Sequence, residues 1–448
     1  MTETQSETPF FLAGNYGPVA DELTVHDLPV TGAIPPELSG RYLHNGPNPP
    51  SGMEGHWFFG DGMVHGVRLD GGRAEWYRNR FVRTAKLERG MPADPMQMMP
   101  DPTASAANTH VIAHAGRIWA LEEAHLPYEL TPELDTIGLY DFGGRLTTPF
   151  TAHPRLCPQT GELHFFGSSP FPPYLTYHVL DAGGQLVHSA PITLPGPAWM
   201  HDFMITREHA IFMDLPVLFN LEGAMRGEPS IAWSDGYGAR VGIVPRFGTD
   251  ADVRWFEVEP CFVFHPLNAF IDGDTVVCDV GRHESMWRDS MDQFSPSYLH
   301  RWRFNLTTGE VQEQQLDDVW HGFPRVADDV VGLPNRYGWA NGPRDAAGQL
   351  GGPGVVVKYD LETGRSDRFD LGPTAYPDEF VFVPGGSSGA EDDGYAMGFV
   401  YDATIDRSDL VILDATDPRA EPVARVHLPS RVPHGFHGSW VSDAALTR

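Results

Sequence analysis

Several features that define large protein classes are scarce in this 448-residue chain. Cysteine occurs three times, at Cys157, Cys261 and Cys278, without CxxC spacing, so we expect neither a disulfide framework nor a thiolate metal site. Basic residues number 31 against 60 acidic ones, and the net charge of −29 disfavours nucleic acid and anionic lipid as partners. No apolar run reaches the ~18 residues of a membrane-spanning helix.

A secretory signal is also missing from the beginning of the sequence. MTETQSETP is polar and acidic, whereas a signal is basic and then apolar. We therefore expect residues 1–8 to be a disordered end and residues 9–448 to form a single domain. Sparse thiols fit a reducing compartment, so the expected location is the cytoplasm.

Turn-forming residues, in contrast, are abundant, with 48 glycines and 40 prolines. One pattern recurs: an apolar alternating run ends in Asp or Asn, and a turn with glycine or proline leads into a second alternating run. Each copy predicts a β-hairpin, because Gly and Asn/Asp supply the positive φ of tight turns. The Asp or Asn positions are Asp70, Asp141, Asp181, Asn305, Asp360 and Asp414.

The spacing of these hairpins indicates the fold. Successive Asp/Asn positions are 71, 40, 124, 55 and 54 residues apart, and the gap of 124 is long enough to contain a degenerate copy. A four-stranded propeller blade takes about 40–50 residues. The sequence thus predicts an all-β propeller of about seven blades, with residues left for long loops on one face. The competing folds are a pair of β-sandwiches and a generic meander.

Four of the 20 histidines share a context, since each lies at the start of an apolar, strand-like run. They are separated by 48, 64 and 172 residues, and the last gap equals about three blades. One histidine from each of several blades would meet the others at the propeller axis. Four neutral imidazoles suit Fe(II), Cu(II), Ni(II) or Zn(II), and octahedral iron would keep two positions for O2. The four residues are His153, His201, His265 and His437.

The segment RVPHGFHGSWV contains two candidates, His434 and His437. Residues three apart in a strand point to opposite faces, so one metal cannot easily bind both. Spacing alone leaves the choice open. Glu123 and Glu379 lie in apolar runs, where an unpaired carboxylate is costly. They are candidates for accepting a hydrogen bond from the outer nitrogen of a metal-binding imidazole, or are ordinary exposed acids at strand ends.

Several segments, in the same order along the chain, resemble the carotenoid cleavage oxygenase family, which also contains lignostilbene dioxygenases and a retinoid isomerase. Besides the histidine segments, they are GAIPPELSGRYLHNGPNP (32–49), HWFFGDGMVHGV (56–67), ANTHVIAHAGRIWALEEAHLPYEL (107–130), DEFVFVP (378–384), EDDGY (391–395) and GFHGSW (435–440).

The resemblance implies a seven-bladed propeller with a dome of loops and helices over the axial face that bears iron. It implies one Fe(II) per chain, with His153, His201, His265 and His437 as ligands and with Glu123 and Glu379 as their carboxylate partners. His434 then lies beside the site.

The chain departs from the family at one of these carboxylates. Relatives carry a glutamate in a Glu-Phe-Pro-Arg-like stretch, whereas HGFPR places Gly322 there. His265 would then lack its carboxylate partner, and water, His321 or a nearby Asp would have to substitute. Such a loss typically costs about 10–100-fold in metal affinity or activity.

The activity implied by the resemblance is that of an Fe(II) dioxygenase, which uses O2 to cleave a conjugated C=C bond of a small hydrophobic substrate into two carbonyl products. Trp199, Phe264 and Phe436 are candidates for the apolar substrate tunnel, or are simply core. Glu122 stands where stilbene-cleaving relatives usually carry lysine. In addition, GMPADPMQMMPDPTAS (90–105) replaces their Tyr-Arg-Asn-Pro-Phe-Thr-Asp-Asp-like stretch. Both differences favour a carotenoid or apocarotenoid.

Three alternative functions remain open from the sequence: cleavage of stilbenes or phenylpropenoids, isomerisation with iron as a Lewis acid, and a non-catalytic propeller that binds a carotenoid or a protein. The methionine-rich segment 91–99 is interpreted either as an apolar mouth in peripheral contact with a membrane or as a loop packed on the propeller. The pattern indicates no particular oligomeric state.

Overall fold

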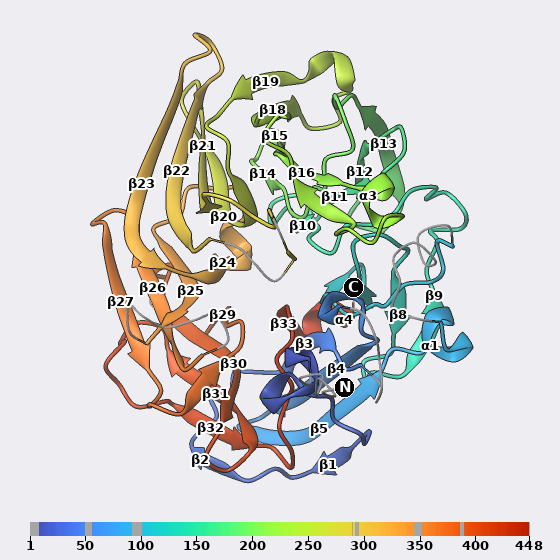
Figure 1. Ribbon diagram of the computed structural model, residues 1–448. Coiled ribbons are helices and arrows are strands. Elements are labelled where there is room, and N and C mark those ends of the chain that lie inside the picture. Colours follow the sequence, from blue (N-terminus) through green and yellow to red (C-terminus); the bar gives the residue numbers. More distant parts are fainter. Residues whose placement is uncertain are drawn as a thin grey trace, which may run out of the picture.

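Seven large antiparallel sheets surround a central axis (Figure 1). This arrangement confirms the prediction of an all-β, seven-bladed propeller. The computed structural model describes residues 9–49, 56–91, 101–288, 290–291, 295–344, 352–385 and 389–447. The expected disordered end, residues 1–8, lies outside these ranges, and so does segment 91–99 apart from Met91.

Blades 2 to 6, numbered in chain order, contain four strands each. Blade 2 consists of β6 (His110–His114), β7 (Arg117–Leu121), β8 (Tyr128–Leu130) and β9 (Thr136–Leu139). Blade 3 consists of β10 (Arg155–Leu156), β11 (Leu163–Ser168), β12 (Leu175–Leu180) and β13 (Leu186–Ile192). Blade 4 consists of β14 (Met204–Ile205), β15 (His209–Asp214), β18 (Arg240–Pro245) and β19 (Arg254–Glu257). Blade 5 consists of β20 (Phe262–Asp272), β21 (Thr275–His283), β22 (Ser297–Asn305) and β23 (Val311–Trp320). Blade 6 consists of β24 (Gly322–Arg325), β25 (Tyr337–Pro343), β26 (Gly354–Asp360) and β27 (Arg365–Asp370).

Blades 1 and 7 close the ring, because each combines strands from both ends of the chain (Figure 1). Blade 1 has the order β1 (Thr24–His26), β5 (Arg73–Phe81), β4 (Gly62–Asp70), β3 (Gly40–Pro47) and β33 (Gly438–Ser442). Blade 7 has the order β2 (Val30–Gly32), β32 (Ala424–His427), β31 (Arg407–Asp414), β30 (Gly394–Asp402) and β28 (Ala375–Pro377), with β29 (Val381–Pro384) also paired to β30. The pairing of β3 with β33 runs from Gly40 opposite Ser442 to His44 opposite Gly438.

Short elements connect or cover the blades. A two-stranded sheet of β16 (Val217–Phe219) and β17 (Ile231–Trp233) is inserted into blade 4. Among the described residues, the α-helices are α1 (Ala85–Arg89), α3 (Leu221–Ala224) and α4 (Asp443–Leu446), and the 3-10 helices are η1 (Phe10–Leu12), η2 (Gly14–Tyr16), η3 (Trp57–Phe59), η4 (Asp250–Asp252) and η5 (Asp328–Val330). Within the part of the chain that the structure describes, no helix has the length and hydrophobicity needed to cross a bilayer.

The hairpin pattern locates most of the outer strands. Asp70 ends β4, and Gly71 and Gly72, with φ of 52° and 78°, make the turn into β5. The prediction at Asp141 was wrong, because the outer hairpin of blade 2 turns between β8 and β9, and Asp141 follows β9. The degenerate copy in the longest gap is the β18–β19 hairpin.

The hydrophobic core is divided among the interfaces between neighbouring blades. Every residue of β11 and β12 is buried, which is typical of strands covered on both faces. One cluster joins Ile211 of blade 4 to Cys278 of blade 5. All three cysteines are buried and free, as expected.

Three buried histidines give the fold a predictable sensitivity to acid. Burial lowers the pKa of His65, His164 and His178 to about 3, against about 6.5 when unfolded. The unfolded chain thus takes up more protons below pH 6.5, and the stability that these residues contribute is lost as the pH falls from about 6.5 toward 3.

We expect the free energy of unfolding to decrease from pH 7 to pH 5, by on the order of 1 kcal/mol per pH unit for each histidine. Chemical denaturation at several pH values measures this change. The His164→Gln variant should show a shallower pH dependence, and an identical profile in that variant would contradict the assignment.

Candidate metal centre and its cavity

The four histidines come from equivalent places on four blades. His153 lies two residues before β10, His201 three residues before β14, and His437 immediately before β33. His265 is the fourth residue of β20. Strands β10, β14 and β20 are the first strands of their blades, and β33 is the edge strand of blade 1. The long gap between the last two histidines spans blades 6 and 7, so the sequence spacing reflects positions around the ring.

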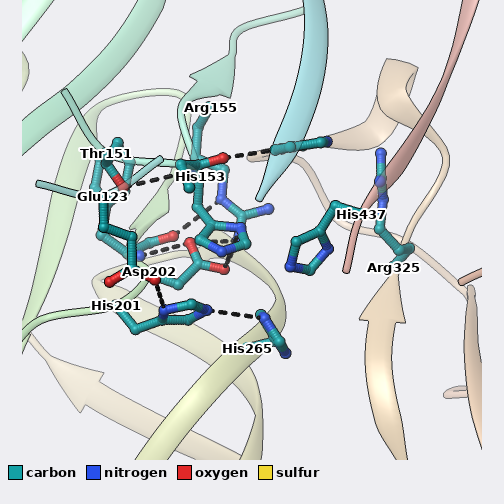
Figure 2. Close-up of polar contacts among 12 residues, drawn as sticks. Glu123, Thr151, His153, Arg155, His201, Asp202, His265, Arg325 and His437 are labelled. Carbon is teal, nitrogen blue, oxygen red and sulfur yellow. Dashed lines mark hydrogen bonds and ion pairs between the residues drawn. The ribbon is translucent and has the colours of Figure 1, made fainter. Parts of the chain in front are cut away.

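Figure 2 shows the four imidazoles gathered at one point. One nitrogen of each ring lies within 4.8 Å of the corresponding nitrogen of every other ring. The Nε2 atoms of His201 and His265 are 3.1 Å apart. Nε2 of His153 is buried without a hydrogen-bond partner among the described residues. Four converging nitrogen atoms, one of them buried and unpartnered, can hold one metal ion.

The electrostatics of the cluster favour neutral rings. Burial lowers the pKa of His153, His265 and His437, and their mutual proximity adds to the shift of the first two. Neutral imidazoles have free lone pairs, which metal coordination requires. The site therefore fits a divalent cation better than it fits a network of charged histidines.

Carboxylates contact the outer nitrogens of three of the four rings. Glu123, in the loop after β7, contacts Nδ1 of His201. Oε1 of Glu379, between β28 and β29, lies 3.1 Å from Nδ1 of His437. Oδ2 of Asp202 lies 3.7 Å from Nδ1 of His153. Acceptors in hydrogen-bond contact, as Glu123 and Glu379 are, fix the orientation of a ring and make its other nitrogen a better ligand.

Glu379 is the most strongly held of these acids. It is 1% exposed, and its Oε2 accepts hydrogen bonds from Nη1 of Arg325 at 3.2 Å and from the backbone N–H of Gly438 at 2.8 Å. Burial alone would raise the pKa of this carboxyl, but Arg325 and His437 outweigh burial and lower it to about 2. Glu379 is thus an anion at physiological pH.

A cavity of about 610 Å³ opens beside the cluster and is lined by His201, His265 and His437. The three aromatic residues proposed from the sequence all line it: Trp199, Phe264 and Phe436. Further lining comes from η2, η3, α3 and the β16–β17 insertion. The cavity is mostly apolar, as ligand sites usually are.

Residues 16–442 match the family model described as "Retinal pigment epithelial membrane protein". A carotenoid cleavage oxygenase of Mycobacterium tuberculosis is 39% identical, over 97% of this chain and 98% of the relative. The chain belongs to the carotenoid cleavage oxygenase family. A carotenoid 9,10(9',10')-cleavage dioxygenase of Arabidopsis thaliana is 36% identical, over 97% of this chain and 90% of the relative. Membership confirms the prediction that the protein is an enzyme of the oxygenase class.

Solved structures of the carotenoid cleavage oxygenase family share the fold. The lignostilbene dioxygenase of Pseudomonas brassicacearum superposes with a TM-score of 0.89 at 29% identity, over 97% of this chain and 99% of the other. A variant of the Synechocystis apocarotenoid oxygenase gives a TM-score of 0.86 at 30% identity, over 96% and 98% of the two chains.

His265 differs from the other three histidines of this oxygenase, because no carboxylate of the described residues lies within ion-pair distance of it. Gly322 lines the cavity near it, and the ring of Phe323 stacks on that of His265 at 5.4 Å. The suggestion that His321 substitutes is not supported, since neither of its ring nitrogens makes a hydrogen bond within the described structure.

Two residues of the site escaped the sequence reasoning. Asp202 lies in the apolar stretch AWMHDFMI, and the rule that selected Glu123 would have found it. Its carboxylate forms two hydrogen bonds with Arg155, at 2.7 and 2.6 Å (Figure 2). No local sequence pattern indicates a role for Arg325, because its partners Glu379 and Gly438 are distant in the sequence. His434 lies outside the cluster and contacts Asp378.

Proposed function

We propose that this protein is a non-haem Fe(II) dioxygenase that cleaves a conjugated C=C bond of a carotenoid or apocarotenoid with O2, giving two carbonyl products. The observation that carries the proposal is the convergence of four imidazole nitrogens within 4.8 Å of one another beside an apolar cavity. A structural neighbour is a cobalt-substituted form of the Synechocystis enzyme, which supports metal binding at such a centre.

In this proposal, His153, His201, His265 and His437 hold one Fe(II) per chain. Glu123 and Glu379 keep two of these rings in place through their outer nitrogens, and the carboxylate of Asp202 lies 3.7 Å from that of His153. The iron would supply the redox chemistry that activates O2 toward an electron-rich double bond.

The aromatic wall of the cavity would hold the substrate beside the metal and exclude water. The ring of Phe264 lies 4.2 Å from that of His201, and the ring of Trp199 lies 5.2 Å from it. Flat aromatic surfaces next to the metal can hold a conjugated chain beside it and exclude water. Phe436, directly before His437, lies against Trp57 at 4.6 Å and continues this wall.

Polyenes suit this lining better than phenols do. The described lining contains no lysine or arginine that could bind a phenolate. Glu122 lies at the lining position where stilbene-cleaving relatives usually carry lysine, and it contacts Nδ1 of His125. Stilbene or phenylpropenoid cleavage remains the second candidate, supported by the lignostilbene dioxygenase among the structural neighbours.

Anaerobic loading with Fe(II), followed by addition of O2 and a substrate panel, tests the proposal. Apocarotenals and carotenoids should lose their visible absorbance and yield two carbonyl fragments identified by mass. Faster turnover of 4-hydroxystilbenes would favour the second candidate, and turnover without O2 or bond cleavage would favour an isomerase. No product from any polyene or stilbene, with iron-replete protein, would refute the proposed activity.

Gly322 provides a test of the metal centre itself. The Gly322→Glu substitution should supply the carboxylate that His265 lacks and raise iron affinity about tenfold or more. Competition with a chelator measures that affinity. Gly322→Gln is the matched control, because it adds a side chain of the same size without a charge. Equal changes in the two variants would show that a carboxylate at this position does not act on His265.

A further inference from the structure

Two irregular strand segments lie next to each other beside the metal centre. The register of β20 with β21 shifts just before Pro266, which leaves His265 outside the regular ladder. The register of β24 with β25 shifts between Gly322 and Arg325, the interval that contains Phe323. Strands β20 and β24 are the first strands of neighbouring blades and contact each other. Irregularities of this kind redirect side chains and are common next to active sites.

Phe323 adopts a backbone conformation that is unfavourable for its side chain. Its φ is 52°, in the left-handed region, which bulky side chains rarely occupy. The next residue is Pro324, and a residue before proline is normally extended. Such a conformation persists only where the surrounding contacts compensate for it, and residues of this kind gather at functional sites. The contacts of the Phe323 ring therefore indicate what the conformation achieves.

The ring of Phe323 contacts two of the four imidazoles of the metal centre. It stacks on the ring of His265, with a centroid distance of 5.4 Å and an interplanar angle of 28°. It meets the ring of His437 edge to face, at 5.2 Å and 76°. The centroids of these two imidazoles are themselves 4.8 Å apart. One side chain thus packs against both rings.

His265 has the greatest need of such a contact. Glu123 and Glu379 contact the outer nitrogens of His201 and His437, whereas no carboxylate of the described residues lies within ion-pair distance of His265. Within the described structure, the only hydrogen bond of the His265 ring joins its Nε2 to Nε2 of His201. That contact uses the nitrogen of His201 opposite the one that contacts Glu123, and a bound metal ion would replace it. Only packing would then fix the orientation of the His265 ring.

We propose that Phe323 is a positioning residue of the metal centre: its ring holds His265 in place where His201 and His437 use carboxylates. Stacking fixes the plane of an imidazole without a partner on its outer nitrogen, and offset aromatic pairs are favourable beyond the area that they bury. The left-handed backbone of β24 places the ring where it can do so. This inference rests on the metal site of the proposed function and adds a residue to that site.

Metal affinity in variants of Phe323 tests this role. Phe323→Ala removes the ring and keeps a Cβ in the left-handed conformation, whereas Phe323→Gly removes both the ring and the strain. Both variants should bind Fe(II) about 10–100-fold more weakly in competition with a chelator. Phe323→Gly should nevertheless unfold at a higher denaturant concentration than Phe323→Ala, because glycine adopts a positive φ without steric cost. Equal losses of affinity at different stabilities would separate positioning of the ligand from general destabilisation.

A spectroscopic readout and a matched control complete the test. Co(II), loaded without O2, has visible bands that depend on ligand geometry, and they should shift or broaden in Phe323→Leu. This variant keeps an apolar side chain, so it remains informative if the smaller variants do not fold. Phe165→Leu is the control, because Phe165 is fully buried and stacks on His178 at 4.8 Å in blade 3, outside the cluster. The Phe165→Leu protein should lose stability and keep both its metal affinity and its Co(II) bands.

The outcomes distinguish this inference from the proposed activity. Unchanged metal affinity and Co(II) bands in the Phe323 variants would overturn the inference and leave the proposed activity intact. Equal changes in Phe165→Leu would also overturn it, since any loss of aromatic packing would then have the same effect. Weakened metal binding in the Phe323 variants of a protein that cleaves no polyene or stilbene would support the inference and refute the proposed activity.

Discussion

Replacement of His201 by alanine is expected to reduce bound iron to a small fraction of one ion per chain and to lower cleavage activity at least 100-fold. His201 occupies a central place in the cluster, because its Nε2 lies 3.1 Å from Nε2 of His265. Its loss also leaves the partly buried Glu123 without its histidine partner. Loss of a residue that merely supports a ligand costs about 10–100-fold, so loss of the ligand itself should cost more.

Iron analysis after anaerobic reconstitution measures the first effect, and product formation measures the second. His321→Ala is the matched control, since His321 is buried, lines the same cavity and lies outside the cluster. The His321→Ala variant should retain its iron. Full iron content in His201→Ala, or an equal loss in His321→Ala, would contradict the assignment of the metal site.

The second large effect is expected at Glu379. Glu379→Ala removes the buried partner of the mostly buried guanidinium of Arg325, which keeps only the exposed Asp328 as an ion-pair partner, and breaking a buried pair typically costs about 3–5 kcal/mol. It also removes the acceptor on Nδ1 of His437, which should weaken iron binding about 10–100-fold. Chemical denaturation measures the first loss, and chelator competition measures the second.

A double variant separates these two roles of Glu379. Glu379→Ala combined with Arg325→Met removes both charges, so it should recover part of the lost stability. Iron binding should stay weak, because the double variant still lacks the acceptor for His437. Recovery of iron affinity together with stability would show that Glu379 acts only by balancing the charge of Arg325.

The sequence predicted the blades best where local turn chemistry determines the structure. The turn after Asp70 follows directly from its two glycines, whereas Asp141 also precedes two glycines but lies after a hairpin that turns at 131–135. Strand β2 had no local signal, because its three residues are exposed and it forms only by pairing with β32 at the other end of the chain. Such a strand depends on ring closure and not on its own periodicity.

The same distinction applies to the site. The four histidines and Glu123 could be identified from the sequence because burying a polar side chain among apolar residues is unfavourable unless it has a partner. Arg325 acquires its role only from partners that are distant in the sequence, the carboxylate of Glu379 and the backbone carbonyl of Gly438. No pattern within a short stretch of sequence reports such contacts.

Closure of the propeller by β33 has a consequence for biosynthesis. His437 immediately precedes β33, and this strand takes its place only by pairing with β3, which is synthesised long before it. A nascent chain that has not yet emerged past residue 442 can present three of the imidazoles but not the fourth. Metal acquisition should therefore follow the pairing of β33 with β3, and chains that lack β33 would fail to capture the ion even when most of their blades have folded.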